Sequence, residues 1–215
     1  MGDASHTEGA RLWAEAQALA RTAQAVRGGR PSRVPPLLFF TDPERTPRPW
    51  ETAARMPPGS GVVFRGFGRD EALNEARRLR AVTRERGMTL LIGRDADLAD
   101  RIEADGLHLP EAALSAAYAL SGRRPDWILT GAAHSVGAAL AARDLDAVIL
   151  SPIFPAGGAS ASRPALGVEA ILAAGAGPTP VLALGGIAAE RIAELAGTGC
   201  AGVAAIDGVI AAFAP

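Results

Sequence analysis

Two histidines and one arginine directly follow short apolar runs, where their side chains could do chemistry. His108 and His134 both stand at such ends, and His134 precedes Ser135, a residue type that caps helices. Histidine titrates near neutral pH, so either one could transfer protons, or it could be a hydrogen-bonded structural residue. Arg65 could hold an anion or pair with a carboxylate such as Asp42. We predict His134 and Arg65 as catalytic residues.

Glycine-rich turns late in the chain could hold a phosphate group. Gly185 and Gly186 follow the run VLAL, and Gly208 follows VAAID. In such turns backbone N–H groups approach an anion closely because no side chain intervenes. Asp207 places a carboxylate in the same turn, so we expect it to weaken phosphate binding unless it caps the last helix. The predicted substrate or phosphate ligands are His108, Ser151, Ser160, Arg163, Gly185, Gly186, Asp207 and Gly208.

Short apolar runs alternate with helical patterns from residue 37 onward. This alternation predicts βαβ units and a parallel sheet. Eight units at this spacing predict an α/β fold, a closed (β/α)8 TIM barrel, with its site at the carboxyl ends of the strands. An open doubly wound sheet is the alternative, although no early G-x-G-x-x-G turn supports it. The expected strands are Leu37–Thr41, Gly61–Arg65, Thr89–Ile92, Gly106–Leu109, Trp127–Thr130, Ala147–Ser151, Val181–Leu184 and Gly202–Ile206.

The first 36 residues differ from the rest and predict an N-terminal helical extension and linker, 1–36, before the barrel, 37–215. Ala10–Val26 has apolar residues three or four apart, which is typical of an amphipathic helix. Its apolar face needs a partner surface, either on the barrel or on a second subunit in a homodimer. Helices expected later include 69–86, 95–104, 135–143, 168–174 and 188–197.

Composition limits the possible partners. The 215 residues carry a formal net charge of −1, so no global field favours nucleic acid or an anionic membrane. All 22 residues counted as Lys or Arg are Arg, which excludes Schiff-base chemistry and a P-loop lysine. The single cysteine permits no disulfide within the chain, and no apolar run is long enough for a bilayer. We therefore expect a cytoplasmic protein that acts on small molecules.

The order of several motifs resembles the thiamine phosphate synthase/TenI family. The motifs are FFTD, VVFR, LLIGRDADLA, ADGLHLPEAAL, AAHSVGAALAA, LDAVILSPIFP, ALG, VLALGGI and AGVAAIDGVI, spanning about Leu37 to Ile210. The resemblance implies a (β/α)8 barrel that handles the two halves of thiamine. Synthase members join an aminopyrimidine diphosphate to thiazole phosphate with Mg²⁺ and release pyrophosphate. TenI members tautomerise the thiazole, and there the resemblance makes His134 the proton-transfer group.

The chain departs from the family where synthase chemistry needs oxygen donors and lysine. The acidic metal positions fall at Arg94 and Ala113, and the Thr and Lys that follow PIFP are replaced within Ala156–Ala159. Mg²⁺ prefers several well-placed oxygen ligands, so we expect weak or no Mg²⁺ binding, with Asp95 as the metal-ligand candidate and Glu111 out of register. The eighth-turn Ser is replaced by Asp207.

Three functions remain open from the sequence. The first is a thiamine phosphate synthase-type transferase that acts on, or binds, thiazole phosphate and aminopyrimidine diphosphate. The second is a TenI-like thiazole tautomerase that needs His134 and no metal. The third is a non-catalytic barrel that binds a thiamine-related ligand.

Overall fold

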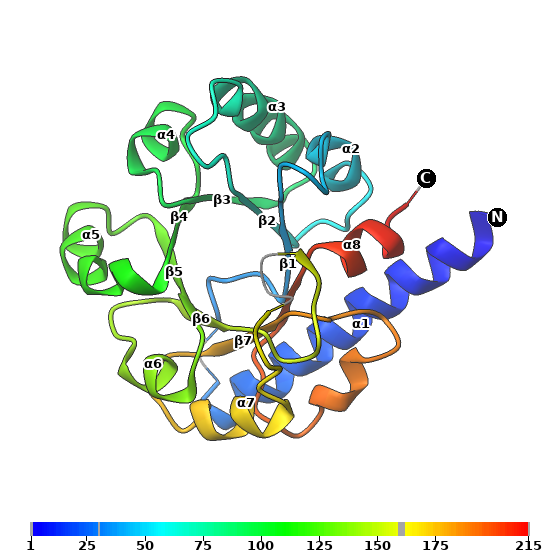
Figure 1. Ribbon diagram of the computed structural model, residues 1–215, viewed down its shortest axis with the longest axis vertical. Helices are drawn as coiled ribbons and strands as arrows, with labels where there is room; N and C mark the ends of the chain where they lie inside the picture. Colours follow the sequence, from blue (N-terminus) through cyan, green and yellow to red (C-terminus); the bar gives the residue numbers. More distant parts are fainter. Residues whose placement is uncertain (1, 30, 159–161, 215) are drawn as a thin grey trace.

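Eight parallel strands close into one barrel in a computed structural model that describes residues 2–29, 31–158 and 162–214 (Figure 1). The strands follow one another in chain order, and β8 pairs with β1 to complete the ring. The predicted (β/α)8 barrel with an extra N-terminal helix is therefore confirmed. The strands are β1 Leu37–Phe40, β2 Gly61–Phe64, β3 Thr89–Gly93, β4 Gly106–Leu109, β5 Ile128–Ala133, β6 Ala147–Leu150, β7 Val181–Leu184 and β8 Val203–Ala205.

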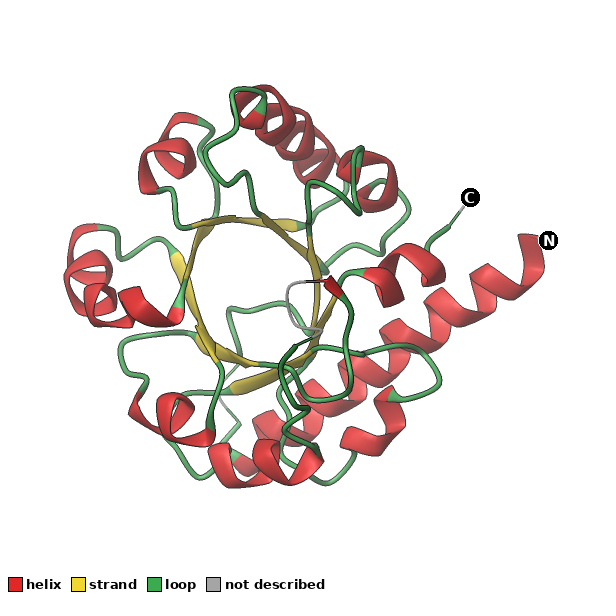
Figure 2. Cartoon of the chain, viewed as in Figure 1, coloured by secondary structure: helices red, strands yellow, loops and turns green. Residues whose placement is uncertain are grey.

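The strands are apolar on both faces because both faces are buried. Alternate residues, such as Leu38 and Phe40, belong to a cluster that fills the barrel, whereas Leu37 and Phe39 belong to the cluster under the helices. Figure 2 shows the strands as a closed ring inside the helical layer. The interior is thus a packed core, and polar side chains are left for the two ends of the barrel.

Four of the five helices expected after the first are present. The segment expected as a helix over 188–197 is an exception, because only a short 3-10 helix forms there. The N-terminal helix contacts this segment and takes up part of the outer layer beside it. The helices after the first are α2 Pro49–Ala53, α3 Ala72–Glu85, α4 Ala96–Arg101, η1 Glu111–Ala116, α5 Ala117–Arg123, α6 Val136–Ala141, α7 Val168–Ala174, η3 Ile192–Leu195 and α8 Asp207–Ala212.

Helix α1 (Gly2–Val26) starts earlier than predicted and packs on the chain's own barrel, along α8 and η3 (Figure 1). Leu12, Ala16, Leu19 and Ala23 form its buried face. Val26 was expected on this face but is 78% exposed, because it ends the helix beyond the last buried position. The apolar face is covered within the chain, and the homodimer stays a prediction.

None of the helices in the described ranges combines the length and the apolar character that crossing a membrane would require.

Substitution of Leu12 tests whether α1 is an integral part of the core. Leu12 is fully buried, so Leu12→Ala should lower the free energy of unfolding by about 2–5 kcal/mol. Urea unfolding followed by circular dichroism measures the change. Leu172→Ala on α7 removes the same atoms from a side chain that is 55% exposed, and it should have little effect. Equal effects of the two variants would contradict a docked α1.

Candidate functional site

A cavity of about 570 Å³ opens at the carboxyl ends of β1 to β7. In parallel barrels this end carries the functional side chains, because the strand-to-helix loops converge there. Six residues predicted from the sequence line it together: Arg65, Asp95, His108, His134, Ser151 and Arg163. Phe40 and Phe67 are further lining residues that the sequence predictions did not include in the site, and Arg94, which stands at an acidic metal position of the family, lines it as well.

His108 is a buried, neutral histidine in the cavity floor. Its Nδ1 lies 2.9 Å from the Thr130 hydroxyl, and the edge of its ring meets Phe40 with the ring centroids 5.0 Å apart. Burial, with smaller contributions from Arg65 and His134, lowers the pKa of His108 to about 3. His108 can therefore offer a hydrogen bond to a ligand at neutral pH but no positive charge.

His134 stands at the end of β5 with one ring nitrogen held in place. Its Nδ1 lies 3.1 Å from the Ser151 carbonyl oxygen and 3.2 Å from the Ser151 hydroxyl. A carbonyl only accepts, so this contact places the proton of a neutral ring on Nδ1 and the lone pair on Nε2. Glu111 accepts a hydrogen bond from the His134 backbone N–H. The arrangement fixes an imidazole at the wall of the cavity as a general acid or base would require.

The Arg65 guanidinium lies over two aromatic rings. Its guanidinium carbon lies 5.7 Å from the Phe40 ring centroid and 5.5 Å from that of Phe67. The Nε atom donates to the Thr41 carbonyl, while Nη2 lies 3.5 Å from the Asp42 carboxylate. Nη2 is buried and makes no hydrogen bond within the described residues. Burial lowers the pKa of Arg65 and Asp42 opposes that shift, so the side chain stays a cation with donor capacity to spare.

The donor set for a divalent metal does not fit this cavity. One oxygen of Asp95 accepts from the Leu98 N–H as the N-cap of α4, and Glu111 is engaged by His134. Gly93 offers no side chain, and a Cβ there would lie 3.2 Å from the Arg65 Cγ atom. Within the described ranges no three His, Cys, Asp or Glu side chains gather to hold a metal.

A second, smaller pocket of about 210 Å³ lies beside the first, with Arg65 and Leu184 in both walls. It contains the predicted glycine-rich turns. A Cβ on Gly185 would lie 2.7 Å from a Pro152 carbon, and one on Gly186 would lie 2.5 Å from the Pro155 carbonyl oxygen. At Gly208 a Cβ would lie only 2.0 Å from the Ile187 oxygen. These three positions therefore require glycine for the turns to pack.

Asp207 does not cap helix α8, which corrects the capping alternative. It is the first residue of that helix, and Ile206 before it occupies the N-cap position. Its carboxylate instead lies 3.0 Å from Nη1 of Arg45, whose Nη2 lies 3.2 Å from the Asp42 carboxylate. Arg45 was missed in the sequence, although its position in the loop after the first strand was a signal that could have found it. Ser160 lies outside the described residues.

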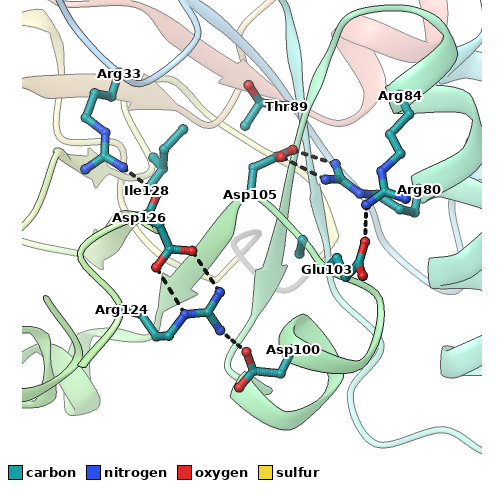
Figure 3. Close-up of a pocket in the computed structure, with 11 residues that line it drawn as sticks. Arg33, Arg80, Arg84, Thr89, Asp100, Glu103, Asp105, Arg124, Asp126 and Ile128 are labelled. Carbon is teal, nitrogen blue, oxygen red and sulfur yellow. Dashed lines mark hydrogen bonds and ion pairs between the residues drawn. The ribbon is translucent and has the colours of Figure 1, made fainter.

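A larger cavity, about 650 Å³, lies at the opposite end of the barrel. Its charged walls are occupied by ion pairs, as Figure 3 shows for Arg80 with Asp105 and for Arg124 with Asp126. Residues at this end of a barrel usually serve stability. We therefore place the functional site at the other end, despite the smaller volume there.

Comparisons with known proteins agree with this geometry. The model of the TMP-TENI family, described as thiamine monophosphate synthase, matches residues 61–209. The chain therefore belongs to this family.

Curated relatives of this chain carry the name thiamine-phosphate synthase, and three of them show the range of similarity. The protein from Methanoculleus marisnigri is 33% identical over 66% of this chain and 69% of its own length. The one from Chlorobium luteolum is 37% identical over 61% of this chain and 64% of its own length. The one from Archaeoglobus fulgidus is 30% identical over 83% and 87% of the two chains.

A solved structure supports the fold. Thiamine phosphate pyrophosphorylase from Pyrococcus furiosus superposes with a TM-score of 0.65 over 80% of this chain and 85% of that one. At 24% identity this likeness shows the fold alone.

The depressed pKa of His108 predicts a pH-dependent stability. Its folded pKa of about 3 lies below the ordinary 6.5, so the unfolded chain binds the proton first. The free energy of unfolding should therefore fall as the pH drops from 6.5 towards 3, by up to about 1.4 kcal/mol per pH unit from this group.

His108→Gln removes the titrating ring and should flatten this slope. Urea unfolding of both proteins at about pH 7.5 and about pH 5 measures it, and the pH 7.5 pair isolates the packing cost of the substitution. The same slope in both proteins would show that His108 is not the neutral, buried group described.

Proposed function

We propose that the chain acts in thiamine biosynthesis as a transferase of the thiamine-phosphate synthase type. Its substrates would be an aminopyrimidine diphosphate and a thiazole precursor, both bound at the barrel mouth. Membership in the TMP-TENI family supports a role in thiamine biosynthesis. The observation that carries the activity is the charge of the 570 Å³ cavity at the carboxyl end, where Arg65, Arg94 and Arg163 face a single Asp95.

The reaction needs positive charge more than it needs a base. The C–O bond between the pyrimidine methyl group and the diphosphate breaks, and the electron pair leaves with pyrophosphate. The lone pair of the thiazole nitrogen then forms the new C–N bond, so no side chain has to remove a proton in this step. Guanidinium groups stabilise a leaving diphosphate by bidentate hydrogen bonds and charge. The buried Nη2 of Arg65, which makes no hydrogen bond within the described residues, is suited to that task.

Mg²⁺ is the cofactor that the family resemblance implies for synthase chemistry. Asp95 is the one acidic residue in the cavity wall, and Arg94 precedes it, so the residues present do not form a Mg²⁺ site. In our proposal the three arginines replace the metal in balancing the diphosphate charge.

A second candidate function is tautomerisation of the thiazole, and the contact between His134 and Ser151 favours it. With Nδ1 turned to the Ser151 carbonyl, Nε2 can take a proton from one ring carbon and return it to another atom. This reaction needs neither the arginine cluster nor a metal.

Removing one cavity arginine tests the transferase proposal. Arg163→Met and Arg94→Met should each weaken binding of the diphosphate substrate by about tenfold or more, because each charge-assisted hydrogen bond contributes about 1.5–3 kcal/mol. Pyrophosphate release measured with EDTA and with added Mg²⁺ is the assay, and we expect the same rate in both. Arg77→Met on the exposed face of α3 is the matched control. Release that requires Mg²⁺, or no release at all, would contradict the proposal.

His134→Gln separates the two functions. If the chain is a tautomerase, this variant should lose about 10²–10⁴-fold in rate, the usual contribution of a general acid or base. Deuterium incorporation into the thiazole in D₂O, followed by NMR, measures that loss. If the chain is a synthase, pyrophosphate release should survive the substitution, since the proton-free step does not use the imidazole.

A further inference from the structure

The smaller pocket contains an ion pair made by the protein itself. Nη1 of Arg45 lies 3.0 Å from an oxygen of Asp207, across 162 positions of sequence. Arg45 also lies against the loop after β6, because a Cβ on Gly158 would lie 3.0 Å from its guanidinium carbon. Both charged groups line the pocket that the glycine-rich turns form. The pair therefore occupies the place where these turns could receive an anion.

The two pockets differ in charge. In the larger one the arginines exceed the single aspartate by two. In the smaller one Arg45 and Arg65 are matched by Asp42 and Asp207. Asp42 contributes a negative charge to this pocket. Burial raises the pKa of its carboxyl group, but the hydrogen bonds from Arg45 and from the Glu44 backbone lower it by more, so the net shift is downward. With the shared Arg65 counted in both walls, the smaller pocket is formally neutral and its neighbour is cationic.

Asp207 can leave this pair more easily than Arg45 can. Its side chain is 65% exposed, whereas that of Arg45 is 27% exposed and also bound to Asp42. Loss of the Asp207 charge would leave Nη1 of Arg45 free and directed into the pocket. A carboxylate and a phosphate compete for the same guanidinium donors, because both accept its paired N–H groups.

We propose that Asp207 is a built-in competitor for Arg45, so that the smaller pocket takes a neutral, hydroxyl-bearing end of the ligand rather than a phosphate ester. This inference rests on the proposed function where it names the thiazole as that ligand. The thiazole alcohol then binds in the neutral pocket, and the diphosphate lies in the arginine-lined cavity. A phosphate can enter only by displacing Asp207 from Arg45.

Inorganic phosphate is the first probe, because its binding does not depend on the thiazole assignment. Titration calorimetry at fixed pH and low salt compares the wild type with Asp207→Asn, which keeps the side-chain shape but removes the charge. We expect phosphate to bind about tenfold more tightly to the variant. Adding Arg45→Gln to Asp207→Asn should abolish that gain. Glu44→Gln removes a neighbouring exposed carboxylate outside the pocket and should behave as the wild type.

The second probe is the pair of hydroxyethyl thiazole and its phosphate ester. The wild type should prefer the alcohol, and Asp207→Asn should shift the preference towards the ester by about tenfold. Phosphate affinity unchanged in Asp207→Asn, or a gain that persists without Arg45, would overturn the proposal. If Asp207→Asn binds phosphate more tightly only when Arg45 is present, and no variant binds either thiazole, then Asp207 competes for Arg45 but the proposed action on a thiazole is refuted. Thermal unfolding of each variant verifies that it is folded. Asp207→Ser is a second substitution that also removes the charge, and it should give the same shift as Asp207→Asn.

Discussion

Closure of β8 onto β1 is the interaction on which the rest of the structure depends. The Val203 N–H donates to the Pro36 carbonyl at 2.8 Å, and Leu38 then pairs in register with Ala204. A side chain at Gly202 could not fit, because its Cβ would lie 2.6 Å from the Pro36 oxygen. Closure leaves no sheet edge and brings eight strand ends to a common rim. The loop after β1 thereby meets helix α8, which is how Arg45 reaches Asp207.

The same closure separates stability from chemistry along the barrel axis. At the amino end, Asp105 and Asp146 each stand one residue before a strand and accept the backbone N–H of the preceding strand, at Leu90 and Leu129 respectively. Each carboxylate also forms an ion pair with an arginine, Asp105 with Arg80 and Asp146 with Arg33. These repeated contacts satisfy backbone donors at the strand starts, and they use both charges locally. At the carboxyl end, the buried Nη2 of Arg65 has no hydrogen-bond partner in the part of the chain that the structure describes.

Burial sets the state of two side chains at the carboxyl end, Arg65 and His108. Arg65 lies over two aromatic rings and has a buried nitrogen without a hydrogen-bond partner among the described residues. His108 is neutral because it is buried near that cation. The Arg65 nitrogen without a hydrogen-bond partner and the buried neutral His108 both cost free energy in the folded chain. Ionisable groups that burial perturbs in this way are common in binding sites. A ligand with anionic groups supplies what the folded chain lacks, and this physical argument agrees with the family to which the chain belongs.

The sequence by itself determined the barrel and most of the rim. Eight apolar runs that alternate with helical patterns predict a closed parallel barrel at this length. The residues just after each run then lie at the mouth of the barrel. Arg65, His108 and His134 could be found in this way because their positions depend on local strand ends. The neutrality of His108 and the partner of Asp207 could not, since the first depends mainly on burial in the closed barrel and the second on charges that closure brings together. Only the tertiary structure joined Arg45 to Asp207, because electrostatic energy depends on distance in space and not on separation along the chain.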